Sequence, residues 1–263
     1  MKRNLESVMP HPLWIGTSWK MNKTRAEARD FASVLATAPI INDIRLHPFV
    51  IPPFTSISEV AGLLAKTRVR IGAQNMHWAD AGAWTGEISP LMIKDAGATL
   101  VELGHSERRT HFSETNETVP LKVAAALKHG LTPLICIGDT REDFDAKQTA
   151  EVLARQVAAA LSKIAPEHRA DTILFAYEPV WSIGEGGTPA APEFVNEQHV
   201  LIKALTERIM DRPLPVLYGG SVNPGNAREL AAQSNVDGLF IGRAAWAVEG
   251  YIGILKAVAG AMA

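Results

Sequence analysis

Short apolar runs alternate with helix-patterned segments along nearly the whole length of this chain. Eight runs have the composition of strands buried on both faces, at 13–17, 49–51, 69–73, 99–103, 133–137, 172–176, 215–218 and 238–241. Apolar residues recur at helical spacing between them, at 30–35, 119–127, 153–164, 194–209, 228–232 and 251–258. This alternation predicts a parallel sheet whose strands are joined by helices.

The number of repeats selects among the folds of this class. Eight strand–helix repeats in 263 residues fit a closed (β/α)8 barrel, which usually forms one domain of about 250 residues. An open doubly wound sheet is the alternative. It normally has fewer strands, and its nucleotide-binding versions carry a glycine-rich turn after the first strand, which this sequence lacks. We therefore expect a single-domain α/β barrel over 13–263, preceded by a flexible N-terminal extension at 1–12.

Charge and cysteine content indicate which partners and which cell compartment to expect. The formal net charge is −2 and no long basic run occurs, which argues against a nucleic-acid partner. No window is long and apolar enough for a membrane span, so we expect no membrane partner. The single cysteine, Cys136, lies inside an apolar run and reads as a buried structural thiol. One thiol excludes an internal disulfide and fits a reducing cytoplasm.

The segment after the sixth apolar run carries the strongest chemical signal. Residues 176–186 read Ala-Tyr-Glu-Pro-Val-Trp-Ser-Ile-Gly-Glu-Gly, which places Glu178 at the C-terminal tip of a strand. Pro179 prevents the strand from continuing, and the glycines at 184, 186 and 187 supply a loop that changes its backbone angles easily. Such a carboxylate is typical of a proton-transfer base under a closing lid. A solvated glutamate in an ordinary turn is the alternative on this segment alone.

Polar residues also follow other apolar runs, where a (β/α)8 barrel has its active site. Lys20 follows the first run and is either a substrate-facing cation or a solubilising charge. His105 follows the fourth run and is either a general acid or part of a polar turn. Glycine turns follow the seventh and eighth runs, at 219–221 and 242–243. Paired turns of this kind let backbone N–H groups approach an anion, and they are the usual phosphate site of this barrel.

Together these segments resemble the triosephosphate isomerase family from Trp14 to the C-terminus. The motifs that carry the resemblance are SWKMN at 18–22, AQN at 73–75, TGEIS at 85–89, GHSERR at 104–109, AYEPVW at 176–181 and YGGS at 218–221. The resemblance implies a TIM barrel and an isomerase that acts on a small phosphorylated ketose. It also implies that the reaction needs neither a metal nor a cofactor.

The resemblance assigns a role to each matching residue. Glu178 is the proton-shuttling base and His105 the neutral electrophile, a pair of roles taken from triosephosphate isomerase itself. Lys20 is the cation beside the carbonyl oxygen, and Glu107 is its partner. The backbone amides expected to hold the phosphate lie near Gly184, Ser221, Gly242 and Arg243. Thr85, in the third loop, would reach into a partner subunit's site, which implies a homodimer.

Three positions depart from the family pattern. Ser18 stands where triosephosphate isomerases carry an asparagine in contact with the substrate, and its shorter side chain leaves room beside Lys20. The lid ends in Gly-Glu-Gly-Gly at 184–187 in place of Gly-Thr-Gly-Lys, and Arg243 replaces the second glycine of the last turn. For the lid and the last turn, neutral drift in an ordinary triose enzyme is an equally good interpretation.

A substrate longer by one hydroxymethyl group would use that room. Adding this group to dihydroxyacetone phosphate gives L-erythrulose 1-phosphate, which the same enediol chemistry converts into D-erythrulose 4-phosphate. The sequence also resembles the tetrulose-phosphate branch of the family, found in erythritol catabolism, at 16–20 and 242–243. We expect the four-carbon substrate, with dihydroxyacetone phosphate as the alternative. A non-catalytic phosphate-binding barrel is a third possibility, against which the joint presence of Lys20, His105 and Glu178 argues.

Overall fold

The structure is a computed structural model that describes residues 11–183 and 187–262. Gly184 and the neighbouring lid residues 185–186 lie outside this part of the chain, as do residues 1–10 of the expected N-terminal extension. Residues 11 and 12 precede the first strand without regular structure. The extension therefore stays a prediction.

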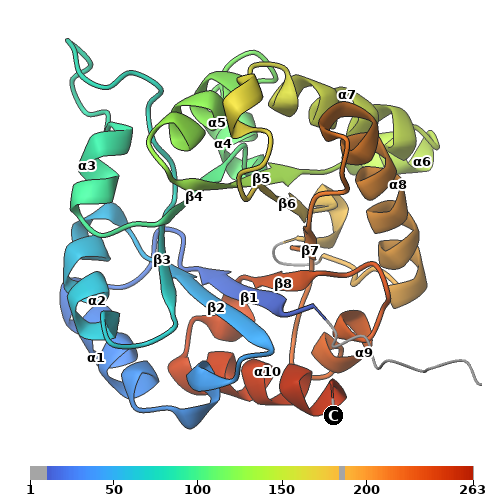
Figure 1. Cartoon of the computed structure of the whole chain (residues 1–263). Helices are drawn as coiled ribbons and strands as arrows, with labels where there is room; N and C mark the ends of the chain where they lie inside the picture. The colour runs from blue at the N-terminus through green and yellow to red at the C-terminus, as the bar shows by residue number, and fades with distance from the viewer. Residues whose placement is uncertain (1–10, 184–186, 263) are drawn as a thin grey trace, which may run out of the picture.

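Eight parallel strands close into a barrel in the order of the sequence (Figure 1). The first strand pairs with both the second and the last, and these two ladders close the sheet. The strands are β1 (Leu13–Ser18), β2 (Leu46–Ile51), β3 (Arg70–Ala73), β4 (Leu100–Leu103), β5 (Thr132–Ile137), β6 (Leu174–Tyr177), β7 (Val216–Tyr218) and β8 (Gly238–Ile241). The expected α/β class and (β/α)8 barrel are confirmed.

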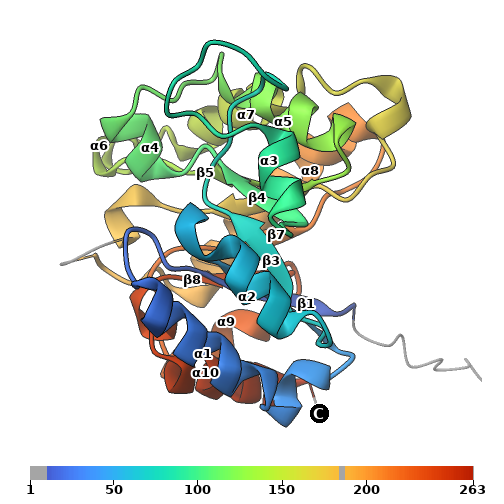
Figure 2. The same cartoon turned by 90° about the vertical axis from the view of Figure 1, so that its left-hand side faces the viewer.

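Helices surround the barrel on its outside (Figures 1 and 2). The α-helices are α1 (Arg25–Ala36), α2 (Ile57–Leu64), α3 (Pro90–Asp95), α4 (Ser106–His111), α5 (Val119–Lys128), α6 (Arg141–Asp145), α7 (Thr149–Leu161), α8 (Pro192–Met210), α9 (Ala227–Ala231) and α10 (Val248–Ala261). Short 3-10 helices lie at η1 (Pro39–Asn42), η2 (Phe54–Ser56), η3 (Pro166–His168), η4 (Val180–Ser182) and η5 (Arg243–Ala245). None of these helices is long and apolar enough to cross a membrane.

Element existence was predicted better than element boundaries. All eight apolar runs overlap strands, and all six helical segments overlap helices. The second strand begins three residues earlier than predicted, at Leu46, because His47 and Pro48 do not look like a buried strand. The sixth strand begins at Leu174, two residues later than predicted. The short helices α2, α3, α4 and α6 were not predicted, since each is too short to show a clear helical period.

Side-chain alternation along the strands divides the core into two parts. Outward-facing residues pack against the helices, and inward-facing residues such as Phe49, Leu100 and Phe240 fill the barrel. Gly16 is needed in this interior, because a Cβ there would overlap the ring of Phe49. Cys136 also faces inward and is buried, so burial raises the pKa of its thiol. Side chains fill the interior of the part of the barrel that the structure describes, and the cavity described below lies at the strand ends.

Candidate active site

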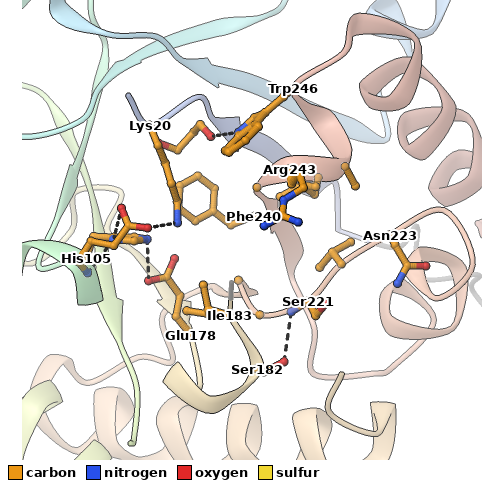
Figure 3. Close-up of a pocket in the computed structure, with 18 residues that line it drawn as sticks. Lys20, His105, Glu178, Ser182, Ile183, Ser221, Asn223, Phe240, Arg243 and Trp246 are labelled. Atoms are coloured by element: carbon orange, nitrogen blue, oxygen red, sulfur yellow. Dashed lines mark hydrogen bonds and ion pairs between the residues drawn. The ribbon is translucent and has the colours of Figure 1, made fainter. Parts of the chain in front are cut away.

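A cavity of about 410 Å³ lies at the C-terminal ends of the strands (Figure 3). Residues that follow five different strands line it, so the closed barrel brings together segments far apart in the sequence. Eight of the expected site residues are among them: Ser18, Lys20, His105, Glu107, Glu178, Ser221, Gly242 and Arg243. Gly184 lies outside the described residues, and Thr85 lies on a different loop.

Lys20 follows β1 and is held in place from two sides. Its backbone is in the left-handed region, with φ of 53°, which costs a non-glycine residue energy and is tolerated where the surroundings impose it. Its carbonyl oxygen accepts a hydrogen bond from Gln74 at 2.9 Å. Its Nζ lies 2.6 Å from Oε1 of Glu107. Burial lowers the pKa of Lys20, but the hydrogen bond and charge of Glu107, together with the charges of Glu178 and Glu102, outweigh this effect. The pKa therefore lies above its ordinary value, and the cation persists.

His105 caps the N-terminus of α4 and is 5% exposed. Its Nδ1 accepts the backbone N–H of Glu107 at 3.1 Å, so in the neutral ring the proton resides on Nε2. Burial, with a further contribution from the charge of Lys20, lowers the pKa of His105 to about 4. The ring is therefore neutral near pH 7 and presents an N–H donor to the cavity (Figure 3).

Glu178 follows β6 directly and is 3% exposed. Its Oε2 lies 3.6 Å from Nε2 of His105 and has no hydrogen-bond partner among the residues described. Burial, strengthened by the charge of Glu102, raises the pKa of this carboxyl well above its ordinary range. A buried carboxylate oxygen without a partner is costly unless a proton or a substrate satisfies it, so Glu178 is suited to accept a proton.

Close packing at Glu178 depends on a glycine of the next strand end. A Cβ on Gly219 would lie 2.7 Å from Cγ of Glu178. A second glycine, Gly138, lets the backbone of Glu178 pass beside the end of β5. These glycines allow the carboxyl to sit inside the barrel mouth rather than above it.

The opposite side of the cavity consists of hydroxyl groups and backbone. The hydroxyls of Ser182 and Tyr218 are 3.0 Å apart, and the N–H of Ser221 donates to Oγ of Ser182 at 3.2 Å. A Cβ on Gly220 would overlap the Tyr218 hydroxyl. The amide of Ser221, expected to hold phosphate, therefore has an intramolecular acceptor that an anion would have to replace.

Gly242 and Arg243 complete this side. Gly242 precedes the 3-10 helix η5, and a Cβ on it would meet no atom within 4 Å, so this residue faces open space. Arg243 lines the cavity on the same side as Ser221 (Figure 3). A helix start and a guanidinium both favour a bound anion. Arg243, hydroxyl groups and backbone amides therefore occupy one side of the cavity, and Lys20, His105 and Glu178 occupy the other.

Thr85 lies on the loop between β3 and α3, which projects from the barrel (Figures 1 and 2). Thr85 is exposed. Its neighbour Trp84 is 52% exposed and lies against the ring of His77, with 4.5 Å between ring centroids. This loop does not contribute to the cavity of its own chain.

Sequence reasoning missed several residues at the barrel mouth, among them two aromatic residues and a buried acid. Phe240 and Trp246 line the cavity, and the indole N–H of Trp246 donates to the carbonyl oxygen of Ser18 at 3.1 Å. Glu102 lies below the cavity and accepts a hydrogen bond from the Ser18 hydroxyl at 2.8 Å. A signal for Glu102 was present, because it is the one charged residue in the apolar run 99–103. In residues 11–183 and 187–262, no group of three or more His, Cys, Asp or Glu is arranged to hold a metal.

The fold and this cavity define the class of protein. The family model of triosephosphate isomerase matches residues 13–258, and the chain belongs to this family. A crystal structure of triosephosphate isomerase from Bartonella henselae superposes with a TM-score of 0.82 at 34% sequence identity. That similarity covers 93% of this chain and 98% of the other.

More similar relatives carry a narrower name. An L-erythrulose-1-phosphate isomerase from Rhizobium rhizogenes is 57% identical over 242 residues, covering 92% of this chain and 93% of the relative. Proteins of the same name from Mesorhizobium japonicum and Brucella abortus are each 59% identical over 242 residues. They cover 92% of this chain and 95% and 94% of the relatives.

The lowered pKa of His105 predicts a neutral ring across the working pH range. In uniformly ¹⁵N-labelled protein, NMR should show His105 as the neutral tautomer with its proton on Nε2 at every pH above 5. Because the pKa falls from 6.5 to about 4 on folding, the unfolded chain binds the proton first as the pH drops. The contribution of His105 to the free energy of unfolding should therefore fall between pH 6.5 and 4, whereas Glu178 and Glu102, whose pKa values are raised, contribute in the opposite direction.

Buried His199, whose pKa is lowered by burial to about 3, shifts the free energy of unfolding in the same direction as His105. Relative to the parent, His105→Gln should therefore gain stability as the pH drops from 6.5 to 4, because the other titrating groups contribute to both proteins. An imidazolium signal from His105 at pH 6 would contradict the assignment.

Proposed function

We propose that this protein is a cofactor-independent isomerase that interconverts L-erythrulose 1-phosphate and D-erythrulose 4-phosphate. The observation that carries the substrate is the 57–59% identity, over 92% of the chain, to proteins named for this activity. The arrangement of the cavity supports the reaction type independently, because a base, a neutral N–H donor and a cation converge on one space. The experiment that tests the proposal is an assay of the purified protein on L-erythrulose 1-phosphate and dihydroxyacetone phosphate in parallel.

The reaction moves a carbonyl group by one carbon and requires two proton transfers at carbon. Glu178 removes the proton from C3 of L-erythrulose 1-phosphate, and the electron pair moves to the C2 oxygen. Lys20 and the Nε2–H of His105 stabilise the developing negative charge there. His105 relays a proton between the two oxygens of the enediol. Glu178 then returns its proton to C2, which leaves the carbonyl at C3. Numbered from the other end of the chain, this carbon is C2 of the product, D-erythrulose 4-phosphate.

The electrostatics of the free site suit this sequence of steps. A base must bind the proton well enough to remove it and must then give it back, and the raised pKa of Glu178 favours the proton-bound state. His105 must be neutral to donate its Nε2–H to the substrate oxygen as an uncharged imidazole. The lowered pKa of His105 keeps it in this form. Glu107 keeps Lys20 oriented through the 2.6 Å contact. The phosphate would then lie near Ser221, Gly242 and Arg243.

We also propose a homodimer in which the projecting loop completes the partner's site. Thr85 is exposed on this loop, and the indole of Trp84 beside it is half-exposed. Met21, which follows Lys20 directly, is 97% exposed. Large apolar side chains exposed next to an active site are typical of a surface that a second chain covers. A partner loop seated there would support the backbone that carries Lys20.

Replacing the base should separate catalysis from binding. Glu178→Gln keeps the shape of the side chain but cannot accept the substrate proton, so kcat should fall by about 10²- to 10⁴-fold. Binding of a non-reactive phosphate ligand should stay within about tenfold. Glu151→Gln, an exposed change on α7, is the matched control and should behave as the parent. A Glu178→Gln enzyme with kcat within tenfold of the parent would remove Glu178 from this role.

Enlarging Ser18 should shift the preference toward the shorter substrate. In Ser18→Asn the extra atoms occupy the space proposed for the additional hydroxymethyl group, and overpacking costs about 1–3 kcal/mol. The ratio of kcat/KM for L-erythrulose 1-phosphate over dihydroxyacetone phosphate should therefore fall roughly 10- to 200-fold.

The matched control is the reciprocal change Asn223→Ser, at the other side of the cavity. It should leave the ratio of the two specificity constants at the parent's value. All proteins must be free of host triosephosphate isomerase. If the parent prefers dihydroxyacetone phosphate, triosephosphate isomerase activity is the correct function. If it turns over neither compound, the protein is the non-catalytic barrel.

Dimerisation should be required for full activity. Trp84→Arg places a charge in the proposed interface and should give a monomer, detected by sedimentation velocity, with strongly reduced kcat/KM. Val200→Arg, at an exposed apolar position on α8, is the matched control and should remain dimeric and active. A monomeric Trp84→Arg variant with the parent's activity would show that the projecting loop contributes nothing to the partner's site.

A further inference from the structure

A buried carboxyl group lies directly below the active-site cavity and is not used in the reaction described above. Glu102 points into the barrel from β4, between the inward-facing Leu100 and the strand end, and is 3% exposed. Burial raises its pKa to about 7, against the lowering effect of the hydrogen bond from Ser18. An apolar residue here would avoid the desolvation cost of a buried acid. The carboxyl group therefore has a purpose other than packing.

Ser18 connects Glu102 to the cavity. Ser18 lines the cavity, and its Oγ lies 2.8 Å from Oε2 of Glu102. Its carbonyl oxygen accepts the indole N–H of Trp246 at 3.1 Å. With both its side chain and its backbone held, Ser18 presents its hydroxyl oxygen in a fixed orientation at the end of β1.

The partner of this hydroxyl determines what it can offer to a ligand. A serine hydroxyl has one proton to donate and two lone pairs to accept with. If Glu102 is ionised, Ser18 must donate to it and is left as an acceptor. If Glu102 is protonated, Glu102 can donate to Ser18, whose own proton is then free for the ligand. An alcohol can pair with Ser18 in both states, whereas a carbonyl or phosphate oxygen can pair only in the second.

The position of Glu102 relative to the base locates the alcohol. Nε2 of His105 lies 3.6 Å from Oε2 of Glu178 and 4.0 Å from Oε1 of Glu102, so the two carboxyl groups flank the same N–H. The carbon that Glu178 deprotonates must lie beside Glu178, and the additional hydroxymethyl group of a four-carbon substrate is attached to that carbon. Ser18, whose hydroxyl contacts Glu102 beside the same N–H, is a part of the cavity wall that this group can reach.

We propose that Ser18 and Glu102 form the subsite for the terminal hydroxymethyl group of the substrate, with Ser18 contacting its hydroxyl and Glu102 acting as a positioning residue. The proposal rests on the four-carbon substrate proposed above and specifies how this substrate is told from the three-carbon one. Selectivity for length then comes from a hydrogen bond to an alcohol as well as from space.

The test compares Glu102→Val, Glu102→Gln and Ser18→Ala with the parent on both substrates. The readout is the ratio of kcat/KM for L-erythrulose 1-phosphate over dihydroxyacetone phosphate. The charge of Glu102 also acts on Glu178, but this effect is common to both substrates and cancels in the ratio. Glu102→Val and Ser18→Ala should each lower the ratio by about 10- to 200-fold. Glu102→Gln, whose amide can still pair with Ser18, should keep most of the preference.

A double variant and a control distinguish this role from a structural one. If Glu102 acts through Ser18, Ser18→Ala with Glu102→Val should lower the ratio no further than the larger single change. Cys136→Ala alters a neighbouring inward-facing residue that interacts with Glu178, and it should leave the ratio unchanged. Thermal unfolding of each variant identifies any that fail to fold. If Glu102→Val does not fold, Glu102→Gln and Ser18→Ala decide the question.

Three results would overturn the inference. Glu102→Val and Ser18→Ala could lower both specificity constants equally, their effects on the ratio could add, or Glu102→Gln could lose as much preference as Glu102→Val. A parent inactive on L-erythrulose 1-phosphate overturns the proposed substrate. In that case, calorimetry with the non-reactive erythritol 4-phosphate and glycerol 3-phosphate decides the subsite. Tighter binding of the longer ligand that Glu102→Val abolishes supports it, and equal binding in the parent overturns it.

Discussion

Exclusion of water from the mouth of the barrel is the condition on which the chemistry of this site depends. Burial disfavours the charged form of any group, so it moves an acid and a base in opposite directions. The pKa of Glu178 rises and that of His105 falls, although the two side chains are only 3.6 Å apart. One physical effect thus produces a carboxyl that binds protons readily and an imidazole that stays neutral. Lys20 keeps its charge in the same surroundings because nearby carboxylates, Glu107 foremost, raise its pKa more than burial lowers it.

The barrel makes that burial possible by close packing at the strand ends. Glycine at 219 and 138 leaves room for the side chain and backbone of Glu178, and the left-handed backbone of Lys20 is supported by Gln74. Such backbone conformations are strained, and an isolated loop would relax out of them. The packed surroundings hold them in place. A packed interior of Phe49, Phe240 and their neighbours provides the rigid base beneath them. The site is therefore a property of the closed sheet rather than of any one loop.

Within this family, the same acid–base residues can serve substrates of different length if the wall beside them changes. Here that wall combines a small residue, Ser18, with a buried acid, Glu102, and an indole, Trp246, that fixes the end of β1. None of the three needs to touch the carbon at which the proton moves. A change of substrate can therefore evolve while Glu178, His105 and Lys20 keep their geometry.

The sequence alone determined the fold class, since eight buried strands alternating with helices have few other ways to cover both faces of a parallel sheet. It also located Lys20, His105 and Glu178, because polar residues immediately after buried strands stand out against their apolar neighbours. It marked Glu102 as a charge inside an apolar run but could not show its partner Ser18, which is 84 residues away in the chain. Nor did it indicate that Trp246 would hold Ser18, or that Ser182 would accept the amide of Ser221. These contacts depend on barrel closure, which brings β1 beside β8 and sets distances that no local pattern encodes.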